Sequence, residues 1–136
     1  MVKFKMAYNW NRPLLPGTIV ASNFNTFDGE PKVGLFVVLY DEQSDMDNMT
    51  DTKNVIAVKL STQNTLVSSY VVRVNKDRHE FLDNDCIACC GKIHILHKTK
   101  QIYKVLGELT PGTYKNVYKM YETFKEAMNK QMMQVL

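Results

Sequence analysis

The 136-residue sequence has no hydrophobic run long enough to span a membrane and no strong excess of charge of one sign. Its longest apolar run, Leu35 to Tyr40, is far shorter than the ~20 residues that a transmembrane helix needs. The segment Met1 to Trp10 has neither a continuous apolar stretch nor a small-residue cleavage site, so no secretory signal is expected. We therefore predict a cytoplasmic protein that does not enter a membrane.

Cysteine is also scarce, and its placement argues against disulfide bonds. Cys86, Cys89 and Cys90 are odd in number and crowded together, which favours reduced thiols. Two of them form a C-x2-C-x4-H-x2-H pattern with His94 and His97, which resembles the opening of a retroviral zinc knuckle. A strand here would place Cys86, Cys90 and His94 on one face and the other two side chains on the opposite face. We therefore predict no metal site, and the sequence indicates no other cofactor.

The composition is typical of one compact domain over residues 1–136. Hydrophobic residues make up 45% of the chain and charged residues 23%. Seventeen basic against fourteen acidic side chains give a net charge of +3, which is too small to indicate a nucleic-acid-binding protein by itself. Residues 1–15 form a cationic N-terminal segment, and residues 41–53 form an acidic loop that we expect to be solvated.

Five segments rich in β-branched and aromatic residues predict strands. They are Thr18 to Phe24, Val33 to Tyr40, Asn54 to Leu60, Thr65 to Val74 and Cys86 to Leu96. The second is almost continuously apolar, so we expect it to be buried on both faces at the centre of the core. The polar residues 61–64 separate the third and fourth segments and predict a hairpin between them.

A helix is predicted over residues 111–133. Thr110 is a suitable N-cap residue, and Pro111 suits the first helical position. Apolar side chains recur at three- and four-residue spacing, namely Tyr114, Val117, Tyr118, Tyr121, Phe124, Met128 and Met132. This stripe is expected to dock on the strands or to form a dimer. Together the elements predict a mainly β fold with α, a small curled antiparallel barrel with a C-terminal helix.

Four stretches of sequence, in this order, resemble the MazF and PemK family of small SH3-like barrel endoribonucleases from bacterial toxin and antitoxin pairs. They are PGTIVASNF, VGLFVVLYDE, NVIAVKLSTQ and KIHILHKTKQIYKVLGELTPGTYKNVYKMYETF. The likeness extends from about Pro16 to Met128 and implies an SH3-like barrel, a homodimer and metal-independent cleavage of single-stranded RNA. In this family the ribose 2′-hydroxyl attacks the adjacent phosphate and leaves a cyclic phosphate.

The resemblance also implies the site residues. Ser61 stands where family members place a threonine at the rim of the RNA groove, so it is expected to contact the scissile phosphate. The family's catalytic Arg-Pro pair is replaced by Gly34 and Leu35, which predicts weak or absent cleavage. Two lysines have the strand parity to replace the lost cation, and a histidine aligns with a second family arginine. The predicted catalytic residues are Ser61, His94, Lys59 and Lys32.

A basic stretch and the polar turn predict the RNA-binding surface. Four lysines with no acid between them lie close together with a tyrosine, which can stack on a base. The predicted nucleic-acid-binding residues are Thr62, Gln63, Lys92, Lys98, Lys100, Tyr103 and Lys104. A solvated strand and turn is the simpler explanation of such a charge run, and it remains open.

Two functions therefore remain open. The first is a protein that binds single-stranded RNA or another polyanion, a weakened or catalytically inactive endoribonuclease with an antitoxin or a host protein as partner. The alternative is an interaction module of a phage or mobile element that inhibits a host protein with the same scaffold. The missing arginine favours the alternative without excluding the first.

Overall fold

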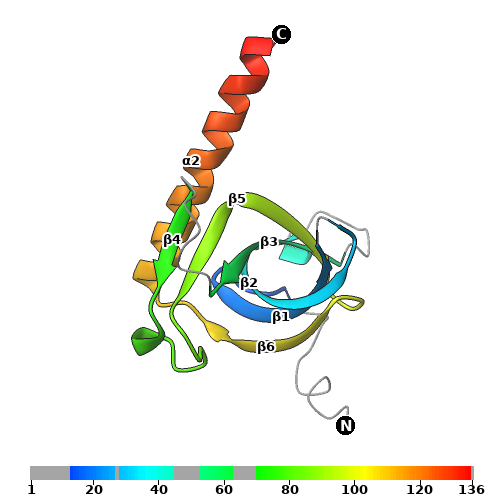
Figure 1. Cartoon of the computed structure of the whole chain (residues 1–136), viewed down its shortest axis with the longest axis vertical. Helices are drawn as coiled ribbons and strands as arrows, with labels where there is room; N and C mark the ends of the chain where they lie inside the picture. The colour runs from blue at the N-terminus through cyan, green and yellow to red at the C-terminus, as the bar shows by residue number, and fades with distance from the viewer. Residues whose placement is uncertain (1–12, 27, 45–52, 63–69, 136) are drawn as a thin grey trace.

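The computed structural model describes residues 13–26, 28–44, 53–62 and 70–135 (Figure 1). In this part of the chain an antiparallel six-stranded sheet precedes one long helix. The strands are β1 (Thr18–Asn25), β2 (Pro31–Asp41), β3 (Asn54–Ser61), β4 (Val71–Val74), β5 (Cys86–His97) and β6 (Ile102–Glu108). The helix is α2 (Pro111–Val135), and two short 3-10 helices are η1 (Glu42–Ser44) and η2 (Lys76–Arg78). The predicted class, mainly β with α, is confirmed.

The sheet has the order β4-β5-β3-β2-β1-β6 and curls into a barrel (Figure 1). β2 is an internal strand, and its segment from Phe36 to Leu39 is buried on both faces, as predicted. Val33 and Tyr40, near the ends of the same strand, are exposed. The apolar run therefore predicts the position of the buried segment of β2 correctly and overestimates the length of that segment.

The predicted hairpin between the third and fourth strands is wrong. β3 pairs with β2 on one side and with β5 on the other, while β4 pairs with β5. β5 lies between the two strands, because its residues 87–89 pair with β3 along one edge and with β4 along the other. Residues 65–69 of the predicted fourth strand lie outside the described residues. A sixth strand, β6, pairs with β1 and adds to the five predicted.

Each face of the sheet carries its own hydrophobic cluster. One, here called the barrel cluster, contains Leu14, Val20, Phe36, Val38, Val55, Ala57, Leu96 and Ile102. The helix cluster, which includes a residue of α2, contains Ile19, Val37, Leu39, Val58, Leu60, Val74, Leu82, Cys86, Ala88, Cys90, Leu109 and Val117. Because successive side chains of a strand point to opposite faces, β2 and β3 supply residues to both clusters.

β5 is irregular, and the irregularity changes which side chains share a face. Lys59 pairs with Cys89 and Ala57 pairs with His94, so residues 90–93 of β5 stand opposite the one intervening residue of β3. The number of extra residues is odd, which reverses the alternation of faces along β5. Cys90 therefore lies in the helix cluster, while His94 packs against Phe36 of the barrel cluster. The prediction that Cys86, Cys90 and His94 share a face is wrong for this reason.

The start of α2 is fixed by capping and by packing. The hydroxyl of Thr110 accepts a hydrogen bond from the backbone N–H of Thr113 at 3.4 Å, in agreement with the predicted N-cap. The backbone N–H of Thr110 donates to Nε2 of the buried His79 at 3.1 Å. Gly17, whose φ of +92° suits glycine, lets the Tyr114 ring approach, since a Cβ there would lie 3.3 Å from that ring. These contacts attach the helix to the sheet.

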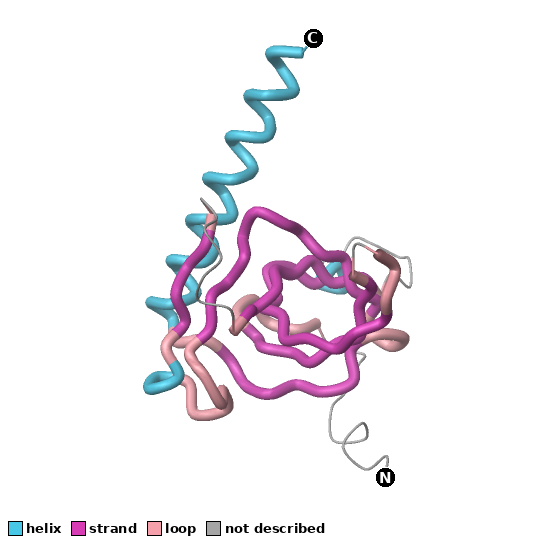
Figure 2. Tube along the Cα trace, in the orientation of Figure 1, coloured by secondary structure: helices cyan, strands magenta, loops and turns pink. Residues whose placement is uncertain are grey.

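The far end of α2 projects beyond the sheet (Figure 2). Val117 is fully buried, and the ring of Phe124 lies 5.3 Å from that of Tyr70. Further along, Met132 and Met133 are 65% and 75% exposed. No helix among the described residues is both long enough and apolar enough to cross a membrane. Among the described residues, therefore, only the first part of the predicted stripe is packed.

Candidate nucleic-acid interface

The C-terminal end of β3 brings the predicted catalytic residues together. Lys59 and Ser61 are two residues apart, and Lys59 pairs with a residue of the barrel cluster, so both project from that face. On the same face Lys32 pairs with Phe24. The Nζ atom of Lys59 lies 5.5 Å from the centre of the Phe24 ring, and the His94 ring lies 6.1 Å from it. All four candidates therefore share one face of the sheet, and three of them, Lys32, Lys59 and His94, lie beside Phe24.

Lys59 occupies the space above Gly34. A Cβ atom on Gly34 would lie 3.2 Å from Cε of Lys59 and 3.1 Å from the ring of Phe24. An arginine side chain at this position would compete with Lys59 for the same volume. Where the resemblance implies an arginine this chain has Gly34, and a lysine of the neighbouring strand lies over that position.

His94 lies in a half-buried aromatic setting. Its ring meets the rings of Phe36 and Phe24 edge-on, at 5.0 and 6.1 Å. Burial lowers the pKa of His94 below 6.5, and the positive charges of Lys92 and Lys59 lower it further. The imidazole is therefore neutral at pH 7 and can accept a proton, as a general base must.

Sequence reasoning did not select Arg73, although the register places it on this face. Ser61 pairs with Ile87, and Ile87 pairs with Arg73. Directly opposed residues of antiparallel strands share a face, so the three form a row across β3, β5 and β4. Recognition of this row requires the pairing of β4 with β5, which the predicted hairpin excluded.

The predicted nucleic-acid-binding residues divide into two groups. Five of them are exposed, namely Thr62, Lys92, Lys100, Tyr103 and Lys104, and Gln63 lies outside the described residues. Thr62 follows Ser61 directly, and Lys92 is close enough to lower the pKa of His94. Lys100 lies in the turn after β5, and the other two lie on β6, which β2 and β1 separate from β3. Lys100, Tyr103 and Lys104 therefore form a second group, on a surface separate from that around Ser61.

Lys98 is wrong as an RNA ligand. Its side chain is fully buried, and its ammonium group forms an ion pair with Asp41 and donates a hydrogen bond to Gln43. Asp41 also accepts hydrogen bonds from the backbone N–H groups of Leu14 at 2.6 Å and Gln43 at 2.9 Å. Asp41 is the buried end of β2 and not part of a solvated loop, while residues 45–52 of that acidic segment lie outside the described residues.

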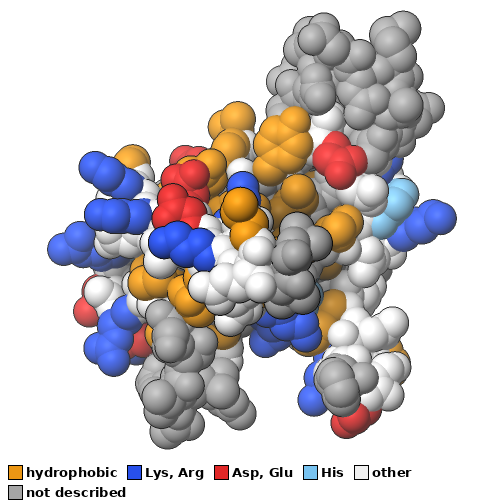
Figure 3. Space-filling model, turned by 90° about the horizontal axis from the view of Figure 1, so that it is seen from above, with side chains coloured by type: hydrophobic (Ala, Val, Ile, Leu, Met, Phe, Trp, Pro, Cys, Tyr) orange, Lys and Arg blue, Asp and Glu red, His pale blue; other side chains and the backbone are white. Residues whose placement is uncertain are grey.

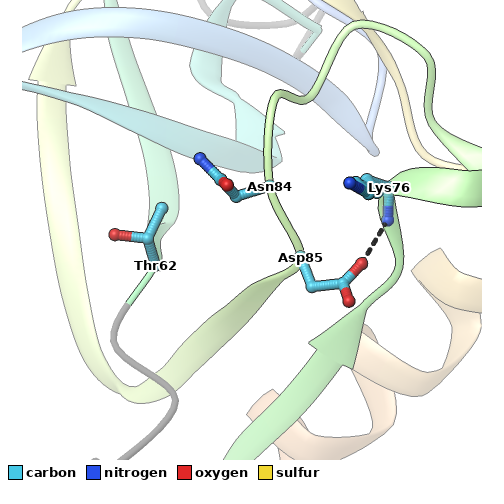
Figure 4. Close-up of a pocket in the computed structure, with 4 residues that line it drawn as sticks. All are labelled: Thr62, Lys76, Asn84 and Asp85. Atoms are coloured by element: carbon cyan, nitrogen blue, oxygen red, sulfur yellow. Dashed lines mark hydrogen bonds between the residues drawn. The ribbon is translucent and has the colours of Figure 1, made fainter.

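A polar pocket lies at Thr62, the residue that follows Ser61 in the sequence (Figure 4). It has a volume of about 420 Å³ and is lined by Thr62, Lys76, Asn84 and Asp85. The backbone N–H of Lys76 donates to Oδ1 of Asp85 at 2.9 Å, which holds the carboxylate against one wall. Hydroxyl, amide and carboxylate groups can together hydrogen-bond to the edges of an unpaired base.

The cysteines do not form a site with the histidines. Burial raises the pKa of Cys86 and Cys89, and it raises the pKa of Cys90 to about 12. These thiols therefore stay protonated at neutral pH, a state in which they are poor nucleophiles and metal ligands. Among the described residues no group of three or more His, Cys, Asp or Glu side chains is placed to hold a metal ion.

Comparison with solved structures gives the fold a context. An endoribonuclease in complex with its cognate antitoxin, from a mycobacterial species, has a TM-score of 0.63 and 18% identity, covering 83% of this chain and 95% of its own. A second mycobacterial endoribonuclease has a TM-score of 0.62 and 17% identity, covering 85% of this chain and 93% of its own. Comparisons with family models and with curated proteins gave no match. The chain has the fold of these endoribonucleases, as its sequence resemblance implies.

Proposed function

We propose that this protein binds single-stranded RNA on the face around Ser61 and cleaves it weakly, without a metal. The observation that carries the proposal is the convergence of Lys59, Ser61 and His94 on one face, with Lys59 in the space above Gly34. These groups supply a positive charge, a hydroxyl and a neutral imidazole. Each can accelerate the attack of a ribose hydroxyl on the adjacent phosphate.

The residues act as follows. His94 accepts the proton of the 2′-hydroxyl as the bond from that oxygen to phosphorus forms and the bond to the 5′-oxygen breaks. The leaving oxygen takes a proton from solvent. Lys59 stabilises the charge that develops on the phosphoryl oxygens, and Ser61 donates a hydrogen bond to one of them. Lysine is a point charge without the bidentate fork of arginine, so Lys59 by itself stabilises this charge less well than an arginine in its place would.

Labelled single-stranded RNA incubated with the protein in EDTA tests this function. We expect RNA to be retained at low salt and cyclic-phosphate ends to accumulate slowly. Ser61→Ala should reduce the rate by ~10²-fold, the usual effect of losing one donor to a phosphoryl oxygen or oxyanion. Thr123→Ala, which removes an exposed hydroxyl of α2, is the matched control and should cleave as the wild type does. Absence of RNA retention by the wild type at low salt would remove the proposal.

A protein partner of the antitoxin type belongs to the same proposal. One of the similar endoribonucleases was solved with its cognate antitoxin. The exposed methionines on the far end of α2 offer an adaptable apolar surface for such a partner or for a second copy in a homodimer. Light scattering of the purified protein measures the dimer directly.

The second candidate function is the interaction module that inhibits a host protein. It is favoured by the same helix end, which projects beyond the sheet and on which Met132 and Met133 are exposed. From the side of this end, Figure 3 shows hydrophobic side chains near the middle of the face and Lys and Arg side chains towards its edges. If the protein has this function, the double variant Met132→Glu with Met133→Glu should no longer inhibit the host protein, and its RNA retention should be unchanged.

A further inference from the structure

The row of residues across β3, β5 and β4 places an arginine beside Ser61. Ser61 and Arg73 both pair with Ile87, one from each side of β5. Neighbouring strands are about 4.8 Å apart, so the two outer residues lie roughly 10 Å from each other in the backbone. An arginine side chain is long enough to reach over the intervening strand towards the hydroxyl. Ile87 is 7% exposed and Arg73 is exposed, so the apolar residue lies beneath and the guanidinium is accessible.

Cations surround Ser61 on this face from three strands. Lys32 comes from β2, Lys59 from β3 and Arg73 from β4. The acid that borders the group is Asp85, whose carboxylate accepts the backbone N–H of Lys76. A ring of positive side chains from separate strands matches the phosphates of a bound strand better than it matches a single carboxylate, because successive phosphates carry successive charges.

Arg73 has a property that the two lysines lack. A guanidinium binds two oxygens of one phosphate at once and keeps its charge at every working pH. The described residues contain one other arginine, Arg78 in η2, which follows β4 and is also exposed. Arg78 does not pair across the sheet, so it is a natural control for the position of Arg73.

We propose that Arg73 binds the RNA phosphate next to Ser61 with its guanidinium and so replaces, from β4, the arginine that the second strand lacks. This inference rests on the proposed function and names the phosphate ligand of that same site. It makes the site a composite of three strands, in which Lys59 and Arg73 approach the phosphate from opposite sides of Ser61.

The test compares Arg73→Gln, Arg73→Lys and Arg78→Gln with the wild type. Retention of a labelled single-stranded oligoribonucleotide is measured at two salt concentrations, and cyclic-phosphate formation is measured in EDTA. We expect Arg73→Gln to weaken retention about tenfold and to lower the salt dependence by about one phosphate contact. Arg73→Lys should keep the salt dependence and lose most of the cleavage, because it keeps the charge without the fork. Arg78→Gln should stay within twofold of the wild type.

A second measurement needs no variant. Phenylglyoxal modifies accessible arginines, and mass spectrometry locates the modified residues. Bound oligoribonucleotide should protect Arg73 and leave Arg78 reactive. If the wild type retains RNA while Arg73 is neither protected nor more sensitive to substitution than Arg78, this inference is overturned and the proposed function stands. If the wild type retains no RNA at low salt, both are overturned.

Discussion

The two ends of β3 both adjoin a lysine, and the surroundings of the two lysines differ completely. At the N-terminal end, beside Val55, Lys98 is fully buried and paired with Asp41. At the C-terminal end, Lys59 lies over the ring of Phe24, and no carboxylate of the described residues lies within 4 Å of it. A buried cation with a carboxylate partner holds the fold together. A cation that faces an aromatic ring is not neutralised by a carboxylate, so it can still bind an external anion. The same strand therefore has a structural end and a binding end.

The largest expected effect is at the structural end. Lys98→Met leaves the Asp41 carboxylate buried without its counter-ion, which typically costs about 3–5 kcal/mol. We expect the free energy of unfolding in urea to fall by that order. Lys98→Met with Asp41→Asn removes both charges, and the asparagine Oδ1 can still accept from one of the two backbone N–H groups, that of Leu14 or that of Gln43, so its loss should be smaller than that of the single variant. An equal loss in the single and double variants would show that the ion pair is not what stabilises this end.

The next effect tests whether Lys59 fills the space above Gly34. Gly34→Arg must displace the Lys59 side chain and crowd Phe24, so we expect it to destabilise the fold by ~1–3 kcal/mol, as overpacking does. Lys59→Ala in the same chain frees that volume and should recover most of the loss. A double-mutant cycle from urea unfolding measures the coupling. Additive effects would mean that the two positions do not share space.

The outline of the fold was predictable because its signals are local. The apolar run of β2 and the Thr110-Pro111 start of α2 each depend on a few adjacent residues, and both predictions hold. The face of His94 was not predictable from strand parity, because three extra residues in β5 reverse it. Gly91, within a strand pattern, was the available sign of such a bulge.

The site was predictable only in part, because its missing members depend on pairing between distant segments. That Lys59 and Ser61 lie on one face was predictable because they are two residues apart on the same strand. Arg73 was not predicted because Ser61 and Arg73 are neighbours only through Ile87 of β5, with which both pair. The sequence does not show that β5 pairs with both β3 and β4. Lys98 was misassigned for the same reason, since its carboxylate partner lies far away in sequence.

A smaller effect is expected at the binding end. Lys59→Gln removes one phosphate contact, so we expect RNA retention to weaken about tenfold at low salt and less at high salt. Stability should change little, because the ammonium group has no ion-pair partner among the described residues. Lys59→Arg should retain binding, and Lys104→Gln on β6 is the control. Loss of stability without loss of RNA binding would make Lys59 structural, like Lys98.

The smallest effect concerns the titration of His94, whose pKa depends in part on the positive charge of Lys59. Burial first, and then Lys92 and Lys59, hold the pKa of His94 below 6.5 in the folded protein. Between that lowered pKa and 6.5 the unfolded chain binds more protons than the folded chain. The contribution of His94 to stability is therefore present above pH 6.5, and it is lost as the pH falls from 6.5 to the lowered pKa. In Lys59→Gln one of the charges that lowers the pKa is gone, so the ring should titrate at a higher pH and the acid-side loss of stability should be smaller. Histidine ring signals followed by NMR from pH 5 to pH 8 measure the shift directly, with Lys100→Gln as a control that should leave His94 unchanged. An unchanged His94 titration in Lys59→Gln would show that Lys59 does not act on the imidazole, and the shared role of the two residues at the phosphate would then lose its electrostatic basis.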